Sequence, residues 1–161
     1  MKVFVSYSSK DLADVETLKA SLANGPIELF IAENSVKPSE SLASEIKSAI
    51  KSCHLFVVVW SNHAKESDWV SQEIGQAVAL GKTILPIVLE GSMGLPGFMS
   101  ELKYISAEGN RKEAIDQACE VISEKYEKRK KEHEEVQRKQ SDSDAKFWLG
   151  AGALALFLFS R

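Results

Sequence analysis

Cysteine is scarce in this chain of 161 residues, and no residues have the spacing of a metal site. Cys53 and Cys119 are too few and too far apart for a disulfide framework or a zinc cluster. The three histidines, His54, His63 and His133, are isolated from one another, which excludes metal-ligand spacing. Two thiols without a pairing pattern fit a reducing cytosol. The apolar helical surroundings of each thiol favour a buried structural role.

The chain also lacks an excess of basic charge and a signal peptide. Its formal net charge is −3, which gives no global field for nucleic acid. Residues 1–110 carry 9 Lys and Arg against 13 Asp and Glu, and residues 111–161 carry 11 against 10. One lysine precedes a short β-type run at the N-terminus, without the apolar stretch of a signal peptide. We therefore expect one cytoplasmic domain with an appendage and no nucleic-acid partner.

Strand and helix signals alternate over residues 1–125. Apolar runs rich in β-formers predict strands at 3–5, 27–31, 55–60, 83–89 and 103–105. The spacing of apolar residues predicts helices at 12–22, 42–50, 67–81 and from 111 onwards. This alternation implies βαβ crossovers, and hence a parallel sheet with helices on both faces. The expected fold class is α/β, a flavodoxin-like doubly wound sheet of five strands.

The predicted helices carry apolar stripes that should face the sheet. The residues expected to be buried are Leu12, Val15, Leu18, Leu22, Leu42, Ile46, Ala49, Ile50, Val70, Ile74, Ala77, Val78, Ile115, Ala118, Cys119 and Ile122. Ser8 and Asp11 resemble a capping box at the start of the first helix.

A binding site in such a sheet is expected at the carboxyl ends of the strands, near the switch point between the first and third. This rule selects the loops at 6–11, 32–40 and 61–68. No glycine-rich loop follows the first strand, which excludes the dinucleotide fingerprint and the Walker motif. The acidic pair of a receiver phosphoacceptor site is missing too, because Ser-Tyr-Ser-Ser stands there.

One carboxylate remains as a candidate. On the predicted helix after the third strand, Trp69 and Glu73 occupy adjoining positions at the shoulder of the apolar stripe. Glu73 is therefore expected to be partly buried beside an aromatic ring and to point towards the strand ends. Partial desolvation would raise its pKa. The alternative is an ordinary helical glutamate that faces solvent.

Four segments, in order and at matching spacing, resemble the Toll/interleukin-1 receptor (TIR) domain family. Residues 3–11 (VFVSYSSKD) resemble its first conserved box, and 36–42 (VKPSESL) resemble the loop after the second strand, with its proline and small residue. Residues 67–77 (SDWVSQEIGQA) are similar to the helix that carries the catalytic glutamate of TIR NAD hydrolases, and 81–87 (GKTILPI) continue the pattern. The resemblance covers roughly residues 1–125.

The resemblance implies a flavodoxin-like fold and, in enzymatic members, cleavage of the nicotinamide–ribose bond of NAD. The products are nicotinamide with ADP-ribose, a cyclised isomer or an ADP-ribosyl conjugate. NAD is the substrate, and neither a cofactor nor a metal is expected. Bacterial and archaeal members often serve antiphage defence, either by depleting NAD or by making a signal. Self-association through TIR–TIR contacts, and contacts with other TIR or effector proteins, are also implied.

The resemblance assigns Glu73 as the catalytic residue and Trp69 as a wall of the nicotinamide pocket. A carboxylate there would stabilise the oxocarbenium-like ribose or orient its hydroxyls. Many relatives have Asp directly after the second strand, where this chain has Ala32. Glu33 could substitute by a shift of one residue. Trp69 has core packing as its structural alternative.

The loop after the first strand supplies the remaining candidates. By resemblance, Tyr7, Ser8 and Ser9 would line the phosphate or ribose side of the site, and Lys10 would contact the diphosphate. Enzymatic relatives often place Arg just after the tyrosine, where this chain has serine. The alternatives are that the serines only cap the first helix and that Lys10 is solvated.

Residues 126–144 are predicted to form a charged helical stalk or linker. Glutamates precede lysine or arginine by four residues in Glu124–Lys128, Glu127–Lys131, Glu134–Arg138 and Glu135–Lys139. The segment Ser141 to Asp144 is predicted to break this helix.

Residues 145–161 form a hydrophobic tail, with 14 uncharged residues from Phe147 to Ser160. These would make about 21 Å of helix, less than the roughly 30 Å hydrocarbon core of a bilayer. Trp148 is placed for an interfacial belt, and Lys146 and Arg161 could reach either interface. We expect the tail to tether the domain to the cell membrane. The alternative is packing against a partner or within an oligomer.

Three functions compete at this point. The first is a TIR-domain NAD nucleosidase in prokaryotic antiphage signalling. The second is a non-enzymatic TIR adaptor or scaffold that acts by homotypic assembly at a membrane. The third is an effector whose tail disrupts bilayers. The first two differ in whether Glu73 is needed.

Overall fold

The computed structural model describes residues 1–31, 40–91 and 94–159, with side chains described at 1–31, 43–91 and 94–141. The chain divides into two compact units, Met1–Ile122 and Ser123–Arg161. The first unit is the α/β domain and contains the site. The predicted limits of the domain, stalk and tail, at residues 125 and 144, stay predictions.

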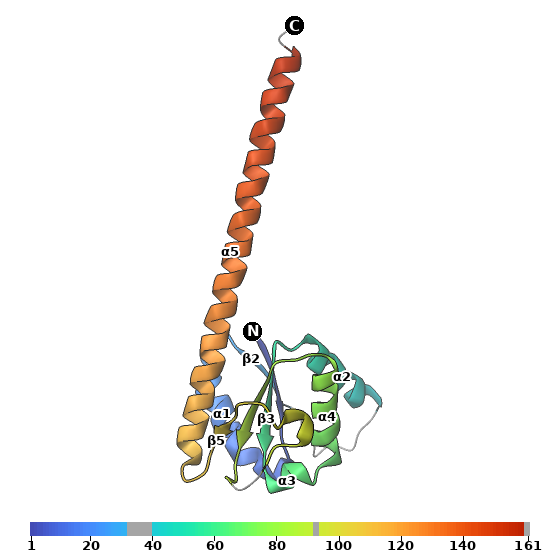
Figure 1. The fold of residues 1–161 in the computed structure, drawn as a ribbon, viewed down its shortest axis with the longest axis vertical. Helices are drawn as coiled ribbons and strands as arrows, with labels where there is room; N and C mark the ends of the chain where they lie inside the picture. Colours follow the sequence, from blue (N-terminus) through green and yellow to red (C-terminus); the bar gives the residue numbers. More distant parts are fainter. Residues whose placement is uncertain (32–39, 92–93, 160–161) are drawn as a thin grey trace. The chain divides into compact units, whose positions relative to one another are not determined.

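Five parallel strands form a single sheet in the order β2-β1-β3-β4-β5 (Figure 1). The strands are β1 (Lys2–Ser6), β2 (Glu28–Ile31), β3 (Leu55–Trp60), β4 (Ile84–Val88) and β5 (Ile105–Ser106). The α-helices are α1 (Leu12–Leu22), α2 (Glu40–Ser52), α3 (Asn62–Lys65), α4 (Asp68–Ala79) and α5 (Arg111–Phe159), with 3₁₀ turns at Ser9–Asp11 and Gly97–Met99. The predicted flavodoxin-like doubly wound fold is confirmed, with its switch point between β1 and β3.

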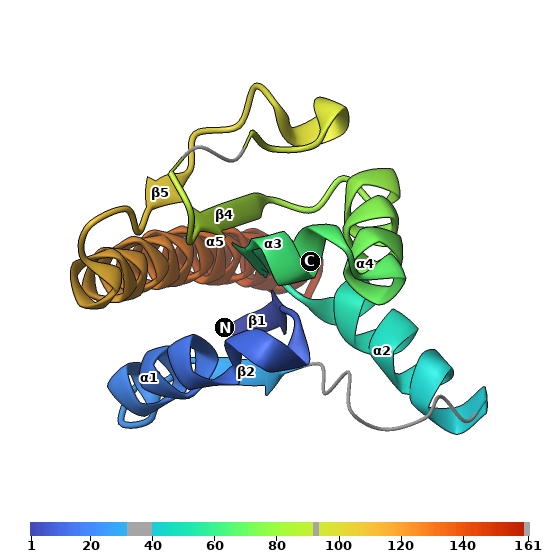
Figure 2. The ribbon, with the colours of Figure 1, turned by 90° about the horizontal axis from the view of Figure 1, so that it is seen from below.

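The hydrophobic core lies on both faces of the sheet. Helix α1 and the first turns of α5 cover one face, and α2 and α4 cover the other (Figure 2). All six residues of β3 are buried because this central strand has neighbours on both edges and helices on both faces. Along β1, Val3 and Val5 point to the α1 face and Phe4 points to the α4 face. This alternation decides which residues of β1 can reach the site.

The apolar stripes are confirmed at most positions, with three corrections. Leu12 is 45% exposed because it is the first residue of α1, and Val78 is 41% exposed because it lies at the edge of the α4 stripe. Cys119 is only half-buried, on the flank of α5. Ala49 is partly buried, and the side chain of Leu42 lies outside the described residues.

The predicted capping box at the start of the first helix is wrong. The side chain of Ser8 makes no capping hydrogen bond, and a 3₁₀ turn at Ser9–Asp11 precedes α1. Asp11 is 6% exposed and turns inward, where its Oδ2 accepts a hydrogen bond from the hydroxyl of Ser61 at 2.5 Å. The carboxylate therefore joins two loops of the sheet edge and does not cap its own helix.

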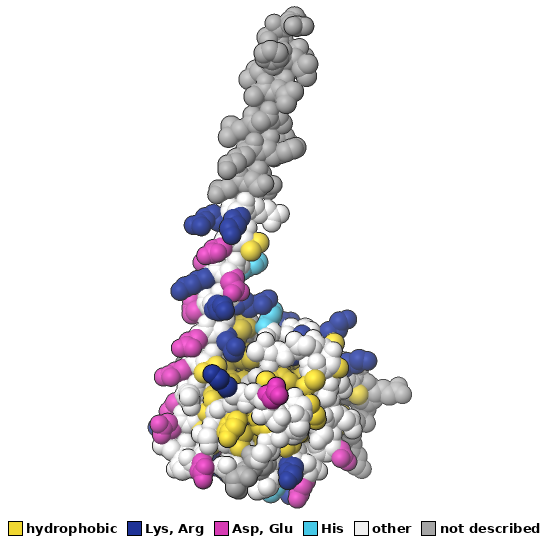
Figure 3. All heavy atoms as spheres, viewed as in Figure 1, with side chains coloured by type: hydrophobic (Ala, Val, Ile, Leu, Met, Phe, Trp, Pro, Cys, Tyr) yellow, Lys and Arg dark blue, Asp and Glu magenta, His cyan; other side chains and the backbone are white. Residues whose placement is uncertain are grey.

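The predicted break at residues 141–144 is also wrong, because α5 continues through it. Serine and aspartate lower helix propensity by no more than about 0.7 kcal/mol per residue relative to alanine, and this segment has neither glycine nor proline. Basic and acidic side chains alternate along the described part of the stalk (Figure 3). The four predicted glutamate–base pairs are not among the ion pairs within 4.0 Å at the described residues. Exposed pairs of this kind contribute little to stability.

Among the described residues, no helix is both long and apolar enough to cross a bilayer. The side chains of 147–160 lie outside the described set, and the membrane role of this segment stays a prediction.

Candidate active site

Helix α4 brings Glu73 to the carboxyl edge of the sheet. The helix begins after Ser67, whose hydroxyl accepts a hydrogen bond from the backbone N–H of Val70 at 3.3 Å. Val70, Ile74 and Ala77 pack against the sheet. Glu73 lies at the shoulder of this stripe and is only 2% exposed, which is deeper than the partial burial that its position in the helix predicts.

The carboxyl group of Glu73 is held by Ser6, the last residue of β1. The Ser6 hydroxyl donates to Glu73 Oε2 at 2.5 Å, and the Ser6 side chain is fully buried. Ser6 is not among the site residues predicted from the sequence, although the sequence carries a sign of its role. It is a serine at a position of a central strand where the alternation of β1 predicts an apolar residue facing α4.

Burial changes the acid–base properties of Glu73. Desolvation raises its pKa from 4.5 to about 7, while the hydrogen bond from Ser6 and the indole of Trp69 act to lower it. The Trp69 Nε1 atom does not meet hydrogen-bond geometry, so its N–H acts on the carboxylate as a nearby dipole. The predicted direction of the shift is confirmed. About half of the Glu73 carboxyls would be ionised near neutral pH.

Three buried polar atoms on one face of α4 have no hydrogen-bond partner in the part of the chain that the structure describes. They are Trp69 Nε1, Glu73 Oε1 and Gln76 Oε1. Residues spaced by four and then three positions share a helix face. One donor, Trp69 Nε1, and two acceptors, Glu73 Oε1 and Gln76 Oε1, are therefore left without a partner that meets hydrogen-bond geometry among the described residues.

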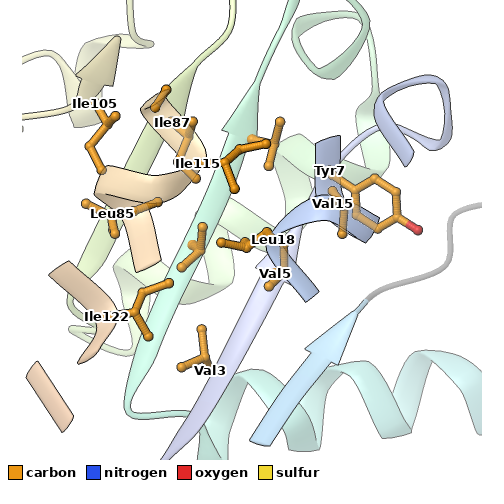
Figure 4. Close-up of a cluster of buried hydrophobic side chains, with 14 of the residues drawn as sticks. Val3, Val5, Tyr7, Val15, Leu18, Leu85, Ile87, Ile105, Ile115 and Ile122 are labelled. Atoms are coloured by element: carbon orange, nitrogen blue, oxygen red, sulfur yellow. The ribbon is translucent and has the colours of Figure 1, made fainter. Parts of the chain in front are cut away.

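Tyr7 lies on the opposite face of the sheet from Glu73. It is 2% exposed and belongs to the core under α1, near Val15 and Leu18 (Figure 4). Tyr7 directly follows β1 and continues its alternation, since Ser6 faces α4 and Tyr7 packs with Val3 and Val5 on the α1 face. The structure brings Trp69 and Ser6 to Glu73 but does not bring Tyr7 there.

The other predicted contacts lie in the turn after β1. Ser8 is buried, with 8% of its surface exposed, whereas Ser9 and Lys10 are exposed. Glu33 lies outside the described residues. The roles assigned to these four residues stay predictions.

A second buried serine–carboxylate pair stabilises the same edge of the sheet. Ser61 follows β3, donates to Asp11 and accepts from the backbone N–H of Ala64 at 2.9 Å. Burial raises the pKa of Asp11, an effect that the hydrogen bond from Ser61 opposes. Arg111 pairs with Asp14 at 2.7 Å on the outer side. This network fixes the loops around the switch point.

Two cavities in the first unit are lined by residues other than Glu73. One of about 480 Å³ is lined by residues of α3, α4 and the 94–98 segment, including Trp60 and Phe98. Another of about 300 Å³ lies at the amino ends of β1 and β2, beside α2. Within the described residues, no three metal-ligating side chains come together.

The fold and the site define a class of protein. It is a doubly wound α/β domain with a buried, serine-held carboxyl group at the carboxyl edge of its sheet, next to the switch point. The chain belongs to the TIR domain family, whose family model matches residues 3–120. No curated protein of similar sequence was found.

Solved structures, two of them TIR domains, have the same fold. The TIR domains of the activated Roq1 resistosome, which recognises the pathogen effector XopQ, are 18% identical, with a TM-score of 0.62 over 75% of this chain and 98% of that chain. The TIR domain of a Toll-related receptor from Hydra magnipapillata is 21% identical, with a TM-score of 0.56 over 66% and 84% of the two chains. A CMP N-glycosidase from Clostridium botulinum is 23% identical, with a TM-score of 0.55 over 73% and 98%.

Proposed function

We propose that this TIR domain cleaves the bond between nicotinamide and ribose in NAD, with Glu73 as the catalytic residue. The observation that carries the proposal is the buried carboxyl of Glu73 at the carboxyl edge of the sheet, in the helix that bears the catalytic glutamate in enzymatic TIR domains. The CMP N-glycosidase supports it in one respect, because the same fold there breaks an N-glycosidic bond.

The reaction breaks the bond between ribose C1′ and the pyridinium nitrogen. The bonding electron pair leaves with neutral nicotinamide, and positive charge develops on the ribose. Ionised Glu73 would stabilise this charge or orient the ribose hydroxyls. Water then adds to C1′ and releases one proton, which gives ADP-ribose. A ribose hydroxyl or adenine nitrogen of the same molecule as nucleophile would give a cyclic product.

Ionisation of Glu73 should limit this reaction at low pH. Its pKa of about 7 means that the anionic form, which is the form that stabilises positive charge, increases as the pH rises from 6 to 8. We expect kcat/KM to rise over this range and then to level off.

The decisive experiment uses the full chain, concentrated or assembled on vesicles, incubated with NAD and followed by mass spectrometry of the products. We expect nicotinamide with ADP-ribose or its cyclic isomer. Glu73→Ala should lose on the order of 10²-fold or more in rate, because it removes a charge that acts in the transition state. Glu101→Ala, at an exposed glutamate, is the matched control and should keep full activity.

Equal activity in Glu73→Ala and the wild type would contradict the assignment. Absence of nicotinamide release from the assembled wild type would favour the second function, an adaptor that acts by homotypic assembly. The near-complete enclosure of Glu73 is the observation that favours this alternative. The adaptor predicts self-association that Glu73→Ala leaves unchanged.

The proposed setting is an assembly of TIR domains tethered at the cytoplasmic face of the cell membrane by residues 147–160, acting in antiphage signalling. Family membership supports the assembly, and the run of uncharged residues in the tail supports the tether.

A further inference from the structure

We propose that Ser6 is the positioning residue of Glu73: its hydroxyl holds Oε2 and thereby presents Oε1 to a hydroxyl group of the substrate. This inference rests on the proposed function of Glu73. It adds a second residue to the site, on a different element and 67 positions away in the sequence.

The first argument is the rigidity of the donor. Ser6 ends β1, which is paired with β2 on one side and β3 on the other, and Ser6 itself lies opposite Val58. Its side chain is fully buried, so water does not compete for the hydroxyl. A donor fixed to a central strand can hold a carboxyl group in one orientation, which a mobile surface donor cannot do.

The second argument concerns the carboxyl oxygen of Glu73 that has no hydrogen-bond partner at the described residues. Oε2 accepts from Ser6, whereas Oε1 is buried without a partner in the described part of the chain. A buried acceptor without a partner is costly, and such atoms are rare in folded proteins, where a catalytic role is one of the explanations for them. The nearby Trp69 Nε1 also has no partner there that meets hydrogen-bond geometry, although its N–H lies close enough to the carboxyl group to lower the pKa of Glu73. A sugar hydroxyl, which both donates and accepts, matches this pair.

The third argument is that the packing around residue 6 does not explain why a serine occupies this position. The apolar core on the α4 face includes Phe4, which lies two residues before Ser6 on β1, and Val58, which lies opposite Ser6 on β3. A buried hydroxyl here is useful because it bonds to Glu73. Its donation favours the ionised carboxyl and opposes the effect of burial on the pKa. Ser6 therefore affects both the orientation and the charge of the catalytic group.

The test compares Ser6→Ala with Ser61→Ala in the full, assembled chain. Each variant deletes a buried serine hydroxyl that donates to a buried carboxylate at 2.5 Å, and Ser61 bonds to Asp11, away from Glu73. We expect Ser6→Ala to lower kcat about tenfold or more at pH 7 with little change in KM. The rise of kcat/KM with pH should move up by about one to two pH units. Ser61→Ala should lower stability but leave this profile in place.

Two further variants and a second measurement separate the effect of losing the hydroxyl from other effects of substituting Ser6. Ser6→Thr retains the hydroxyl and should restore most of the wild-type profile, whereas Ser6→Cys, a similar shape with a weak donor, should lie between Ser6→Ala and the wild type. Carboxyl ¹³C chemical shifts, assigned by comparison with Glu73→Gln, follow the titration of Glu73 without any substrate. The midpoint of this titration should lie at a higher pH in Ser6→Ala than in the wild type.

The possible failures are distinguishable. If the wild type releases nicotinamide and Ser6→Ala matches Ser61→Ala in rate, pH profile and carboxyl titration, the role of Ser6 is overturned and the proposed function stands. If the assembled wild type releases none, the proposed function fails and the positioning role fails with it.

Discussion

Glu73 illustrates at the scale of one residue how a function can conflict with stability. A carboxyl group that is 2% exposed has lost nearly all of its hydration, and one hydrogen bond from Ser6 replaces only part of it. Its pKa of about 7 is the net result of burial, which raises the pKa, and of the hydrogen bond from Ser6, which lowers it. An amide at this position could still accept the hydrogen bond from Ser6 without the cost of burying a charge, so the acid is best explained by its chemistry.

This conflict predicts that Glu73→Gln is more stable than the wild type at high pH. Because the folded-state pKa of Glu73 is about 7 and the reference value is 4.5, the folded state binds the proton more tightly than the unfolded state. The contribution of Glu73 to stability is therefore highest below pH 4.5 and is lost as the pH rises to about 7, by on the order of 3 kcal/mol. Glutamine avoids that loss and should gain about 1–3 kcal/mol at pH 8.

Urea denaturation at pH 5 and pH 8 measures this difference. At pH 5 the carboxyl of the folded wild type is largely protonated, so the free energies of unfolding of the two proteins should differ by much less than at pH 8. Glu101→Gln, at an exposed site, should show no such dependence on pH. A Glu73→Gln variant that is equally or less stable at pH 8 would show that Glu73 is not desolvated as described.

Helix α4 is the element that positions the site, and both of its ends are well defined. Ser67 caps its amino end, and Gly81 follows its carboxyl end with a φ of +62°. A glycine adopts this left-handed conformation without the strain that a side chain would add. The helix is thereby held with its buried stripe against the sheet and Glu73 at the level of Ser6.

Two glycines of this region should respond oppositely to the same substitution. Gly81→Ala should destabilise the protein by about 1 kcal/mol because of its positive φ. Gly75→Ala, in the exposed interior of α4 with no atom within 4 Å of an added Cβ, should stabilise it by about 0.5–1 kcal/mol. Thermal or urea denaturation of the two variants checks both signs. Stabilisation by Gly81→Ala would contradict the geometry of the helix end, and destabilisation by Gly75→Ala would contradict the open space beside Gly75.

Elements with strong periodicity could be predicted from the sequence, whereas contacts between distant elements could not. The continuous apolar run of β3 and the capped, striped α4 are properties of local sequence, and both agree with the structure. The inward turn of Asp11 depends on Ser61, which lies 50 positions away. Local spacing therefore suggested a capping box that tertiary packing replaced.

The same distinction holds for the site. The position of Glu73 beside Trp69 follows from helix geometry, and it was predicted. The partner of Glu73 depends on which face of β1 meets α4, and the relevant signal was one serine in an apolar alternation. The resemblance placed Tyr7 near the substrate, but the period of two along β1 puts its side chain on the opposite face.

At the scale of the whole molecule, the charged segment and the hydrophobic tail lie in the second unit, after the domain with the buried carboxyl. If the tail tethers the chain, confinement to a surface raises the local concentration of TIR domains without any new contact. A reaction that depends on assembly would then be controlled by the density of the protein on the membrane.

We therefore expect the full chain to co-sediment with anionic phospholipid vesicles and to release more nicotinamide per molecule as its surface density rises. Leu156→Asp should weaken membrane partitioning on the order of 10²-fold, because a carboxylate at the centre of an apolar helix costs about 2.5–3.5 kcal/mol. Gln140→Asp adds the same charge in the stalk and should still bind. If the wild type stays in the supernatant with its tail intact, the tail acts as a protein contact and not as an anchor. If bound protein at every density has the activity of free protein, confinement does not control the reaction.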